Sequence, residues 1–242
     1  MSQVETPLAK KLGNFVDLSP DELACLADLQ SRRRTVAALT EIVYEGQTNH
    51  RAWILQEGWA NCYKLVPSGN RQIIGFPLPG DFMGLRSILL RTSDHSFESL
   101  TDAVISEVSR QRLIDIFHEF PRLAAGILWA TSRDEAMVVE HLVNIGRRSA
   151  IERLAHLFLE LGQRLEMIGL LSPTGFACPL NQYVLADALG LSAIHVNRVL
   201  RQLRERGLIT VKAHQVIIHD LEGLRELAGY DSGYLNHGRP EK

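Results

Sequence analysis

Residues 179–207 of this 242-residue chain read PLNQYVLADALGLSAIHVNRVLRQLRERG, and this stretch decides the fold of the C-terminal part. The pattern predicts two short helices with a tight turn at Gly190, a residue that readily adopts the backbone conformation that ends a helix. Ser192 stands where its hydroxyl can cap the second helix. The first helix has apolar positions at Tyr183, Leu185, Ala186 and Leu189. In the second helix the apolar residues recur at helical spacing and predict one buried face: Val196, Val199, Leu200 and Leu203.

The opposite face of the second predicted helix carries side chains suited to DNA. Asn197 and Arg198 lie near its start, and a helix-turn-helix of this kind inserts its second helix into a major groove. Residues 192–214 hold five Lys or Arg and one Glu, a net charge of +4, although the whole chain carries −2. Because positive charge gathers where phosphates are expected, the sequence predicts double-stranded DNA as a partner and residues 192–206 as the recognition helix.

Composition narrows the class of protein. Hydrophobic residues make up 45% and charged residues 22%, which is typical of a globular chain long enough for two domains. Neither a signal peptide nor a membrane-spanning stretch is seen, so we expect a cytoplasmic protein with no membrane partner. The sequence shows no catalytic triad pattern, P-loop or HExxH pattern, and no paired metal-ligand spacing, so we expect neither an enzyme nor a metal site.

The N-terminal 120 residues change from helical to β-rich character. Ser19-Pro-Asp-Glu22 predicts a capped helix start, and Arg32-Arg-Arg34 is expected to end that helix with cations. Short β-rich runs with turn signals then fill residues 36–110, and Pro67-Ser-Gly-Asn70 predicts a hairpin. These runs favour a closed barrel or roll of antiparallel strands.

A long helix is predicted after Pro121, with two apolar stripes. One stripe, which includes Ile127 and Met137, is expected to pack on the β domain. The other is expected to pack on a second copy of the chain at near coiled-coil spacing, and its dimerisation candidates are Leu128, Thr131, Glu135, Val138, Leu142 and Ile145. Asn144-Ile-Gly146 interrupts the pattern and predicts a hinge.

The remaining residues predict a winged C-terminal domain. A helix over 147–166, a loop over 171–178 and the helix-turn-helix are followed by strands at 208–211 and 215–218, whose hairpin forms a wing. A short helix over 221–227 precedes a polar tail. We therefore divide the chain into an N-terminal helix and β-roll sensor domain (1–120), a central dimerisation helix with hinge (121–146), a winged helix-turn-helix (147–228) and a flexible tail (229–242).

The order of these parts resembles the CRP/FNR family of bacterial transcription regulators. The resemblance covers nearly the whole chain and rests on these residues: Glu45-Gly46, Tyr63, Pro67-Ser-Gly-Asn70, Pro79-Gly-Asp-Phe-Met-Gly84, Arg147-Arg-Ser-Ala-Ile-Glu-Arg-Leu-Ala155 and the run from Leu185 to Leu200. It implies an α+β fold with a cyclic-nucleotide-binding-like β-roll, a homodimer on a palindromic operator, contact with RNA polymerase and a signal received at the roll.

The resemblance also suggests roles for single residues. Arg198 occupies the position of the family's recognition-helix arginine and can grip guanine. Ile194 stands where the family places a base-reading Glu, and an apolar side chain there can press on a thymine methyl instead. His195 and Asn197 are candidates for base or phosphate contacts. Candidates for phosphate contacts alone are Gln182, Ser192, Arg201 and Lys212.

The signal that the roll would sense stays unknown from the sequence. The cyclic-AMP branch holds its ligand with a Glu soon after the turn at Gly84 and with an Arg further on. The Glu is missing from Leu85-Arg-Ser87, and the Arg is missing from His95-Ser-Phe-Glu-Ser-Leu100. On the long helix, Arg133-Asp134 replace the residues with which that branch contacts adenine. Three widely spaced cysteines exclude a single-chain iron–sulfur cluster: Cys25, Cys62 and Cys178. An alternative function is a ligand-sensing regulatory module with DNA binding secondary. It would sense haem through His95, His118 or His141, or thiol oxidation at Cys178, which precedes the helix-turn-helix.

Overall fold

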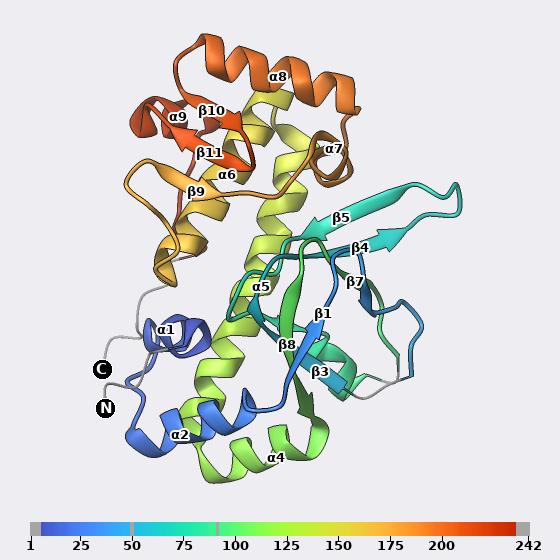
Figure 1. Cartoon of the computed structure of the whole chain (residues 1–242), viewed down its shortest axis with the longest axis vertical. Coiled ribbons are helices and arrows are strands. Elements are labelled where there is room, and N and C mark those ends of the chain that lie inside the picture. Colours follow the sequence, from blue (N-terminus) through green and yellow to red (C-terminus); the bar gives the residue numbers. More distant parts are fainter. Residues whose placement is uncertain (1–5, 49–50, 91, 236–242) are drawn as a thin grey trace. The chain divides into compact units, whose positions relative to one another are not determined.

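A computed structural model describes residues 6–48, 51–90 and 92–235 (Figure 1). The described residues form two compact units. The first holds residues up to 64 and 76–134, and the second holds 65–75 and 135 onward. The long helix α5 (Pro121–Arg147) contributes to both units.

The first unit contains the predicted β-roll, built from two four-stranded antiparallel sheets. One sheet has the order β1-β8-β3-β6 and the other β2-β7-β4-β5, of which β5 is grouped with the second unit. A core of side chains from both sheets, including Leu55, Phe97 and Ile105, fills the roll. The strands are β1 (Arg33–Val36), β2 (Glu41–Val43), β3 (Arg51–Glu57), β4 (Ala60–Leu65), β5 (Arg71–Gly75), β6 (Phe82–Met83), β7 (Ser96–Ser99) and β8 (Ala103–Ser109).

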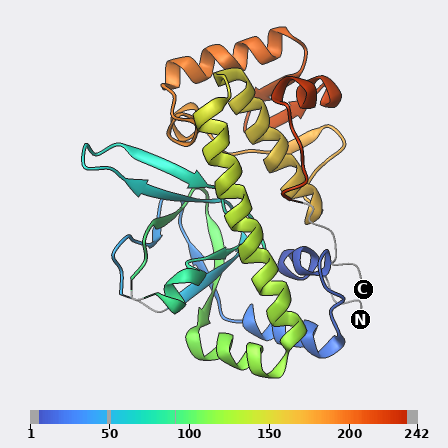
Figure 2. The same ribbon diagram turned by 180° about the vertical axis from the view of Figure 1, so that it is seen from behind.

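Helix α5 does not break where the sequence predicted a hinge. It continues through residues 144–146 and ends at Arg147 (Figure 2). Asn144 stays helical and its amide donates a hydrogen bond of 3.2 Å to the carbonyl of Arg153 on the next helix. The break falls at residues 148–149, where Ser149 begins α6 (Ala150–Met167) and its backbone N–H donates to Glu152 at 2.7 Å.

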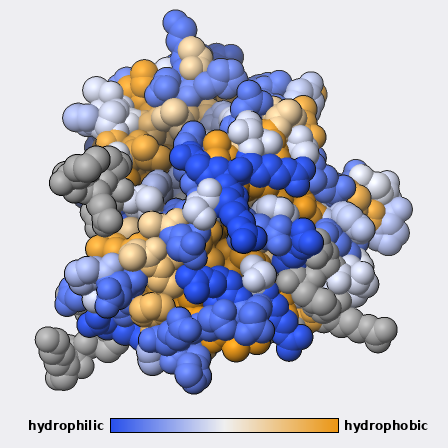
Figure 3. Space-filling model, turned by 60° about the horizontal axis from the view of Figure 1, so that its bottom comes forward, coloured by the Kyte–Doolittle hydropathy of each residue, from blue (hydrophilic) through white to orange (hydrophobic). Residues whose placement is uncertain are grey.

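No helix in the described part of the chain combines the length and apolar character that a membrane span needs. Figure 3 shows one face of the protein, on which hydrophilic side chains predominate and hydrophobic ones lie in patches between them.

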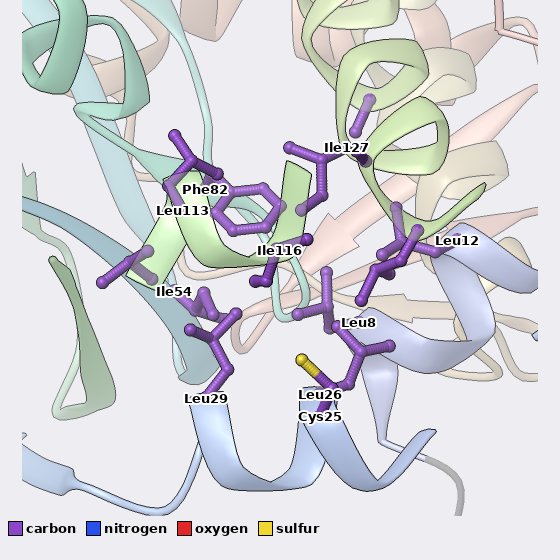
Figure 4. Packing of buried hydrophobic residues seen from close by; sticks show 14 of the residues in the cluster. Leu8, Leu12, Cys25, Leu26, Leu29, Ile54, Phe82, Leu113, Ile116 and Ile127 are labelled. Carbon is purple, nitrogen blue, oxygen red and sulfur yellow. The ribbon is translucent and has the colours of Figure 1, made fainter. Parts of the chain in front are cut away.

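Helices cover one side of the roll and enclose a second core (Figure 4). The helices that contribute with α5 are α1 (Pro7–Gly13), α2 (Pro20–Leu29), α3 (Leu85–Leu89) and α4 (Arg110–Glu119). Ser19 caps α2 with Glu22 as predicted. The predicted ending of this helix at Arg32-Arg-Arg34 is wrong, because α2 ends at Leu29 and residues 33 and 34 pair with Ser106 and Ile105 in β8. Pairing with β8, and not the local run of positive charge, determines the conformation of these two residues.

The second unit contains the winged helix-turn-helix. Its helices are α6, α7 (Gln182–Leu189), α8 (Ala193–Glu205) and α9 (Leu221–Ala228), and its strands are β9 (Gly175–Ala177), β10 (Ile209–Lys212) and β11 (Gln215–Ile218). The sheet order is β10-β11-β9. Strand β9 lies inside the stretch predicted as a loop, because Phe176 buries its ring and pairs with Val216.

The predicted flexible tail is wrong for residues 230–235, which pack on α6. Leu235 is fully buried. The hydroxyl of Tyr230 donates to Gln163 and that of Tyr234 donates to Glu160, both at 2.9 Å. Two aromatic side chains and one leucine within six residues supply enough apolar area to hold this segment. The rest of the predicted tail, 236–242, lies outside the described residues.

Candidate nucleic-acid interface

In α7, the first helix of the helix-turn-helix, the residues that flank the helix determine where it begins and ends. The Asn181 side chain accepts hydrogen bonds from the backbone N–H groups of Tyr183 and Val184 at 2.9 and 3.0 Å. Gly190 has φ of +64° and ends the helix, as predicted. Tyr183 was expected on the buried face, but 66% of it is exposed. Val184 is buried in its place, because the helix begins at Gln182 and turns Tyr183 outward.

Helix α8 begins at the predicted position. Ser192 accepts a hydrogen bond of 3.2 Å from the backbone N–H of His195, which caps the helix. Val196, Val199 and Leu203 are at most 1% exposed, so this side of α8 is fixed against the rest of the unit. Leu200, also expected to be buried, is half-buried. A helix held along one side in this way presents the opposite side to solvent.

The solvent side of α8 carries most of the predicted DNA-binding residues. Ile194 is 83% exposed, Asn197 and Arg198 are exposed, and His195 is half-buried. Ile194, Arg198 and Arg201 follow one another at spacings of four and three residues, which places them on one face of the helix. This face combines a bidentate hydrogen-bond donor at Arg198 with an apolar side chain one turn before it.

Arg201 differs from Arg198 because it already has a partner on its own helix. Its Nε lies 2.7 Å from Oε1 of Glu205, one turn away, and the hydrogen bond raises the pKa of Arg201. Both side chains are more than half exposed, so the pair is weak in water. A phosphate could replace Glu205 as its partner at small cost.

The wing places Lys212 at the end of a two-residue turn. Ala213 and His214, the turn residues, have φ of +50° and +58°, and Lys212 pairs with Gln215 across the hairpin. Both strand ends are exposed. The backbone N–H of Cys178 donates to the carbonyl of His214 at 2.7 Å and so connects the turn to the chain that leaves β9.

The predicted DNA-binding residues thus lie on three segments of one unit. Gln182 is half-buried in the first turn of α7, and Lys212 belongs to the wing. The other six lie on α8 or at its cap: Ser192, Ile194, His195, Asn197, Arg198 and Arg201.

Strand β5 contacts α7, the first helix of the helix-turn-helix, and the sequence analysis did not predict this contact. Arg71 donates from Nε to Oδ2 of Asp187 on α7 at 3.0 Å. The side-chain amide of Gln72 donates to the carbonyl of Ala188 at 3.1 Å. These two pairs join residues 116 positions apart, so no local pattern could have predicted them.

The dimerisation candidates form a largely exposed stripe on α5. Leu128, Val138 and Leu142 are 60%, 47% and 66% exposed, Glu135 is exposed, and Thr131 and Ile145 are half-buried. The Thr131 hydroxyl donates to the carbonyls of Ile127 and Leu128, so it makes its hydrogen bonds within the helix. The second predicted stripe behaves differently, since Ile127 is only 2% exposed and packs in the core of the first unit.

Cys178 is a poor candidate for redox chemistry. It precedes the helix-turn-helix as the sequence suggested, but its side chain is 1% exposed. Burial raises the pKa of the thiol to about 11, so the thiolate needed for oxidation is scarce at neutral pH. The structure therefore argues against the predicted redox role.

Arg86, the arginine that follows Gly84 in the first unit, lies at the surface of the roll and not inside it. Arg86 is 64% exposed and its Nη2 lies 3.2 Å from Asp94. Inside, burial and the nearby charges of Asp94 and Asp134 raise the pKa of Cys62, which marks surroundings that disfavour a negative charge. A buried phosphate needs a cation that offsets its charge, and Arg86 lies at the surface, where it pairs with Asp94.

The three histidines considered for haem lie in three separate parts of the chain. His95 precedes β7 and its Nδ1 lies 2.7 Å from Asp94. His118 is exposed on α4. His141 lies on α5, where burial lowers its pKa. Within the ranges that the structure describes, no group of three or more His, Cys, Asp or Glu is placed to hold a metal ion.

Comparisons with protein families match both units. The family model for a Crp-like helix-turn-helix domain matches residues 152–227, and the model for a cyclic nucleotide-binding domain matches residues 30–120. These ranges contain the recognition helix with its wing and the β-roll, respectively.

Relatives and solved structures agree with the family models. The nitrogen fixation regulation protein FixK of Rhizobium meliloti (strain 1021) is 30% identical over 190 residues, 77% of this chain and 82% of that protein. The anaerobic regulatory protein of Haemophilus influenzae is 26% identical over 88% of this chain and 82% of that protein. The structure of FixK2 from Bradyrhizobium japonicum is similar with a TM-score of 0.74 and 26% identity, over 82% of this chain and 98% of that one.

Proposed function

Since the chain belongs to the CRP/FNR family of DNA-binding transcription regulators, we propose that it acts as a homodimer that binds a palindromic operator through two copies of α8. The observation that carries this proposal is the solvent face of α8. Arg198 stands exposed on a helix whose other side is fully buried, and the surrounding segment 192–214 has a net charge of +4.

The two kinds of contact have different roles in this proposal. Arg198 reads guanine through two hydrogen bonds, with His195 and Asn197 beside it. Gln182, Ser192, Arg201 and Lys212 bind phosphates, which position the helix without specifying a sequence. The Ser192 hydroxyl already accepts the cap hydrogen bond, so it has only its proton to offer a phosphate.

The dimer in this proposal forms along the exposed stripe of α5. Leu128, Val138 and Leu142 follow a spacing of about 3.5 residues, which lets two such helices pack side by side. A dimer fixes two recognition helices about one turn of DNA apart. We further propose that the regulator works in the bacterial cytoplasm, contacts RNA polymerase there, and responds to a signal at the β-roll.

The test begins with DNA selected by the intact protein from a random duplex library. Arg198→Ala should weaken binding to the selected duplex at least about 30-fold, because each of two half-sites loses a contact of about 1–3 kcal/mol. Gel shift at fixed salt measures this change, and sedimentation checks that the variant has the wild-type oligomeric state.

Arg225→Ala is the matched control, since Arg225 is a half-exposed arginine on α9 that pairs with Glu222. It should bind as the wild type does. A footprint of Arg198→Ala indistinguishable from that of the wild type would remove α8 from the role of recognition helix.

A further inference from the structure

Ile194 is an unusual residue for the surface on which it lies. At 83% exposure it is the most exposed large hydrophobic side chain in the part of the chain that the structure describes. The buried residues of α8 lie on the other side of the helix, so Ile194 contributes nothing to the core of the unit. Ala193 precedes it and His195 follows it, and Asn197 and Arg198 stand one turn further along the helix.

A single exposed apolar residue is common on protein surfaces and needs no explanation by itself. Ile194 differs because of what surrounds it. The segment 192–214 carries a net charge of +4, which attracts the phosphates of a duplex and brings the first turns of α8 against base edges. A branched hydrocarbon side chain then meets a surface made mostly of hydrogen-bonding groups.

The major groove offers one apolar group on the base edges, the C5-methyl of thymine. Ile194 has no atom that accepts from cytosine or donates to guanine, so it gains free energy only where it finds that methyl. We propose that Ile194 packs on a thymine methyl and makes thymine a specificity determinant of the operator half-site. This inference rests on the proposed DNA-binding function of α8.

The spacing along the helix limits where that thymine lies. Ile194 and Arg198 are four residues apart, which is about 6 Å along an α-helix. Successive base pairs rise by about 3.4 Å. The thymine read by Ile194 therefore lies within about two base pairs of the guanine read by Arg198.

Deoxyuridine provides a direct test, because it lacks the methyl of thymine and keeps every hydrogen-bonding group. The selected duplex is resynthesised with one symmetric pair of thymines replaced by deoxyuridine, for each thymine in turn. At the position read by Ile194, wild-type affinity should fall about fourfold for each half-site and about 15-fold for both. Ile194→Ala should bind the thymine and deoxyuridine duplexes equally.

Two control variants make the test specific. Ile194→Val keeps a branched apolar side chain and should keep most of the preference for thymine. Leu170→Ala truncates another exposed apolar residue, 50% exposed after α6, and should respond to deoxyuridine as the wild type does.

The outcomes separate this inference from the proposed function. A wild-type protein that enriches no duplex from the library contradicts the proposed function itself. If the wild type binds its duplex tightly but tolerates deoxyuridine at every position, or if Ile194→Ala shows the same sensitivity as the wild type, then the methyl contact is wrong while DNA binding stands.

Discussion

At the scale of single residues, His156 is a buried histidine whose pKa is well below its usual value. It is 2% exposed on α6, and its ring stacks on Tyr234 and meets the edge of Tyr230, with centroids 6.1 and 5.0 Å away. Its Nε2 lies 3.1 Å from a carboxylate oxygen of Glu140. Burial first, and the charge of Arg148 second, lower the pKa of His156 to about 4, against the opposing effect of Glu140.

This pKa predicts that the second unit loses stability in mild acid. A lowered pKa means that the unfolded chain binds the proton more readily, so the contribution of His156 is complete above about pH 6.5 and is lost as the pH falls toward 4. The loss should reach roughly 2–3 kcal/mol at pH 4.5, because a pKa lowered from 6.5 to about 4 is worth about 3.5 kcal/mol when the loss is complete. Urea unfolding of the wild type and of His156→Gln from pH 7.5 to 4.5 measures it.

The variant should be less stable at pH 7.5 and should show a flatter dependence on pH. His118→Gln, an exposed change on α4, serves as the control and should follow the wild-type profile. Parallel profiles for His156→Gln and the wild type would show that another group titrates.

Residue-scale prediction succeeded where a signal is local. Ser19, Gly190 and Ser192 act within one turn of their own backbone, so their roles as helix caps and stops could be predicted from neighbouring residues alone. Burial is not local. Cys178 and Leu235 both looked like loop or tail residues, and their burial depends on partners elsewhere in the chain.

At the scale of elements, α5 combines two faces with different surroundings. One face, which includes Leu123 and Ile127, is buried in the core of the first unit. The other exposes Leu128, Val138 and Leu142, three large side chains that gain by leaving water. A helix that already has a core on one side and still exposes leucines on the other is well suited to self-association.

Leu142→Asp should therefore separate the proposed dimer without unfolding the chain. Leu142 is 66% exposed, so a charge there is tolerated in a monomer but is buried twice in a dimer. Sedimentation at micromolar concentration should show a shift from dimer to monomer, and DNA affinity should fall with it.

Leu39→Asp provides the comparison, because Leu39 is 73% exposed between β1 and β2 of the first unit. It should remain a dimer. An unaltered dimer in Leu142→Asp would exclude this stripe as the dimer contact.

Element-scale prediction depended on periodicity. The two stripes of α5 and the order of roll, long helix and wing followed from spacing and turn residues. Periodicity did not predict the end of α5 or the strand β9. The Asn144 amide donates a hydrogen bond to α6, and Phe176 pairs with a residue of β11, so both depend on other elements. The contact of β5 with α7 joins residues 116 positions apart and had no signal in the sequence.

At the scale of the whole molecule, the proposed dimer fixes the distance between two identical α8 helices and so the spacing of the half-sites that it can bind. Each chain carries a net charge of −2, whereas the segment 192–214 around α8 carries +4, so this segment attracts DNA more strongly than the chain as a whole. In the proposed dimer, two such segments must lie in register with one side of the duplex.

Inserting five base pairs between the half-sites of the selected duplex should abolish dimer binding. Half a helical turn moves one half-site to the opposite side of the DNA, where the second α8 cannot reach it. Gel shift should show affinity falling to that of a single half-site. An insertion that leaves affinity unchanged would mean that the two α8 helices bind independently.

The tip of the wing has a consequence for protein engineering. Ala213 and His214 both adopt left-handed backbone conformations, which cost a non-glycine residue roughly 1–2 kcal/mol. Asn-Gly is the pair that such turns prefer, so the hairpin here is shaped by its flanking strands and not by its own loop. We therefore expect Asn-Gly in place of Ala213-His214 to leave the pairing of Lys212 with Gln215 intact and to stabilise the hairpin.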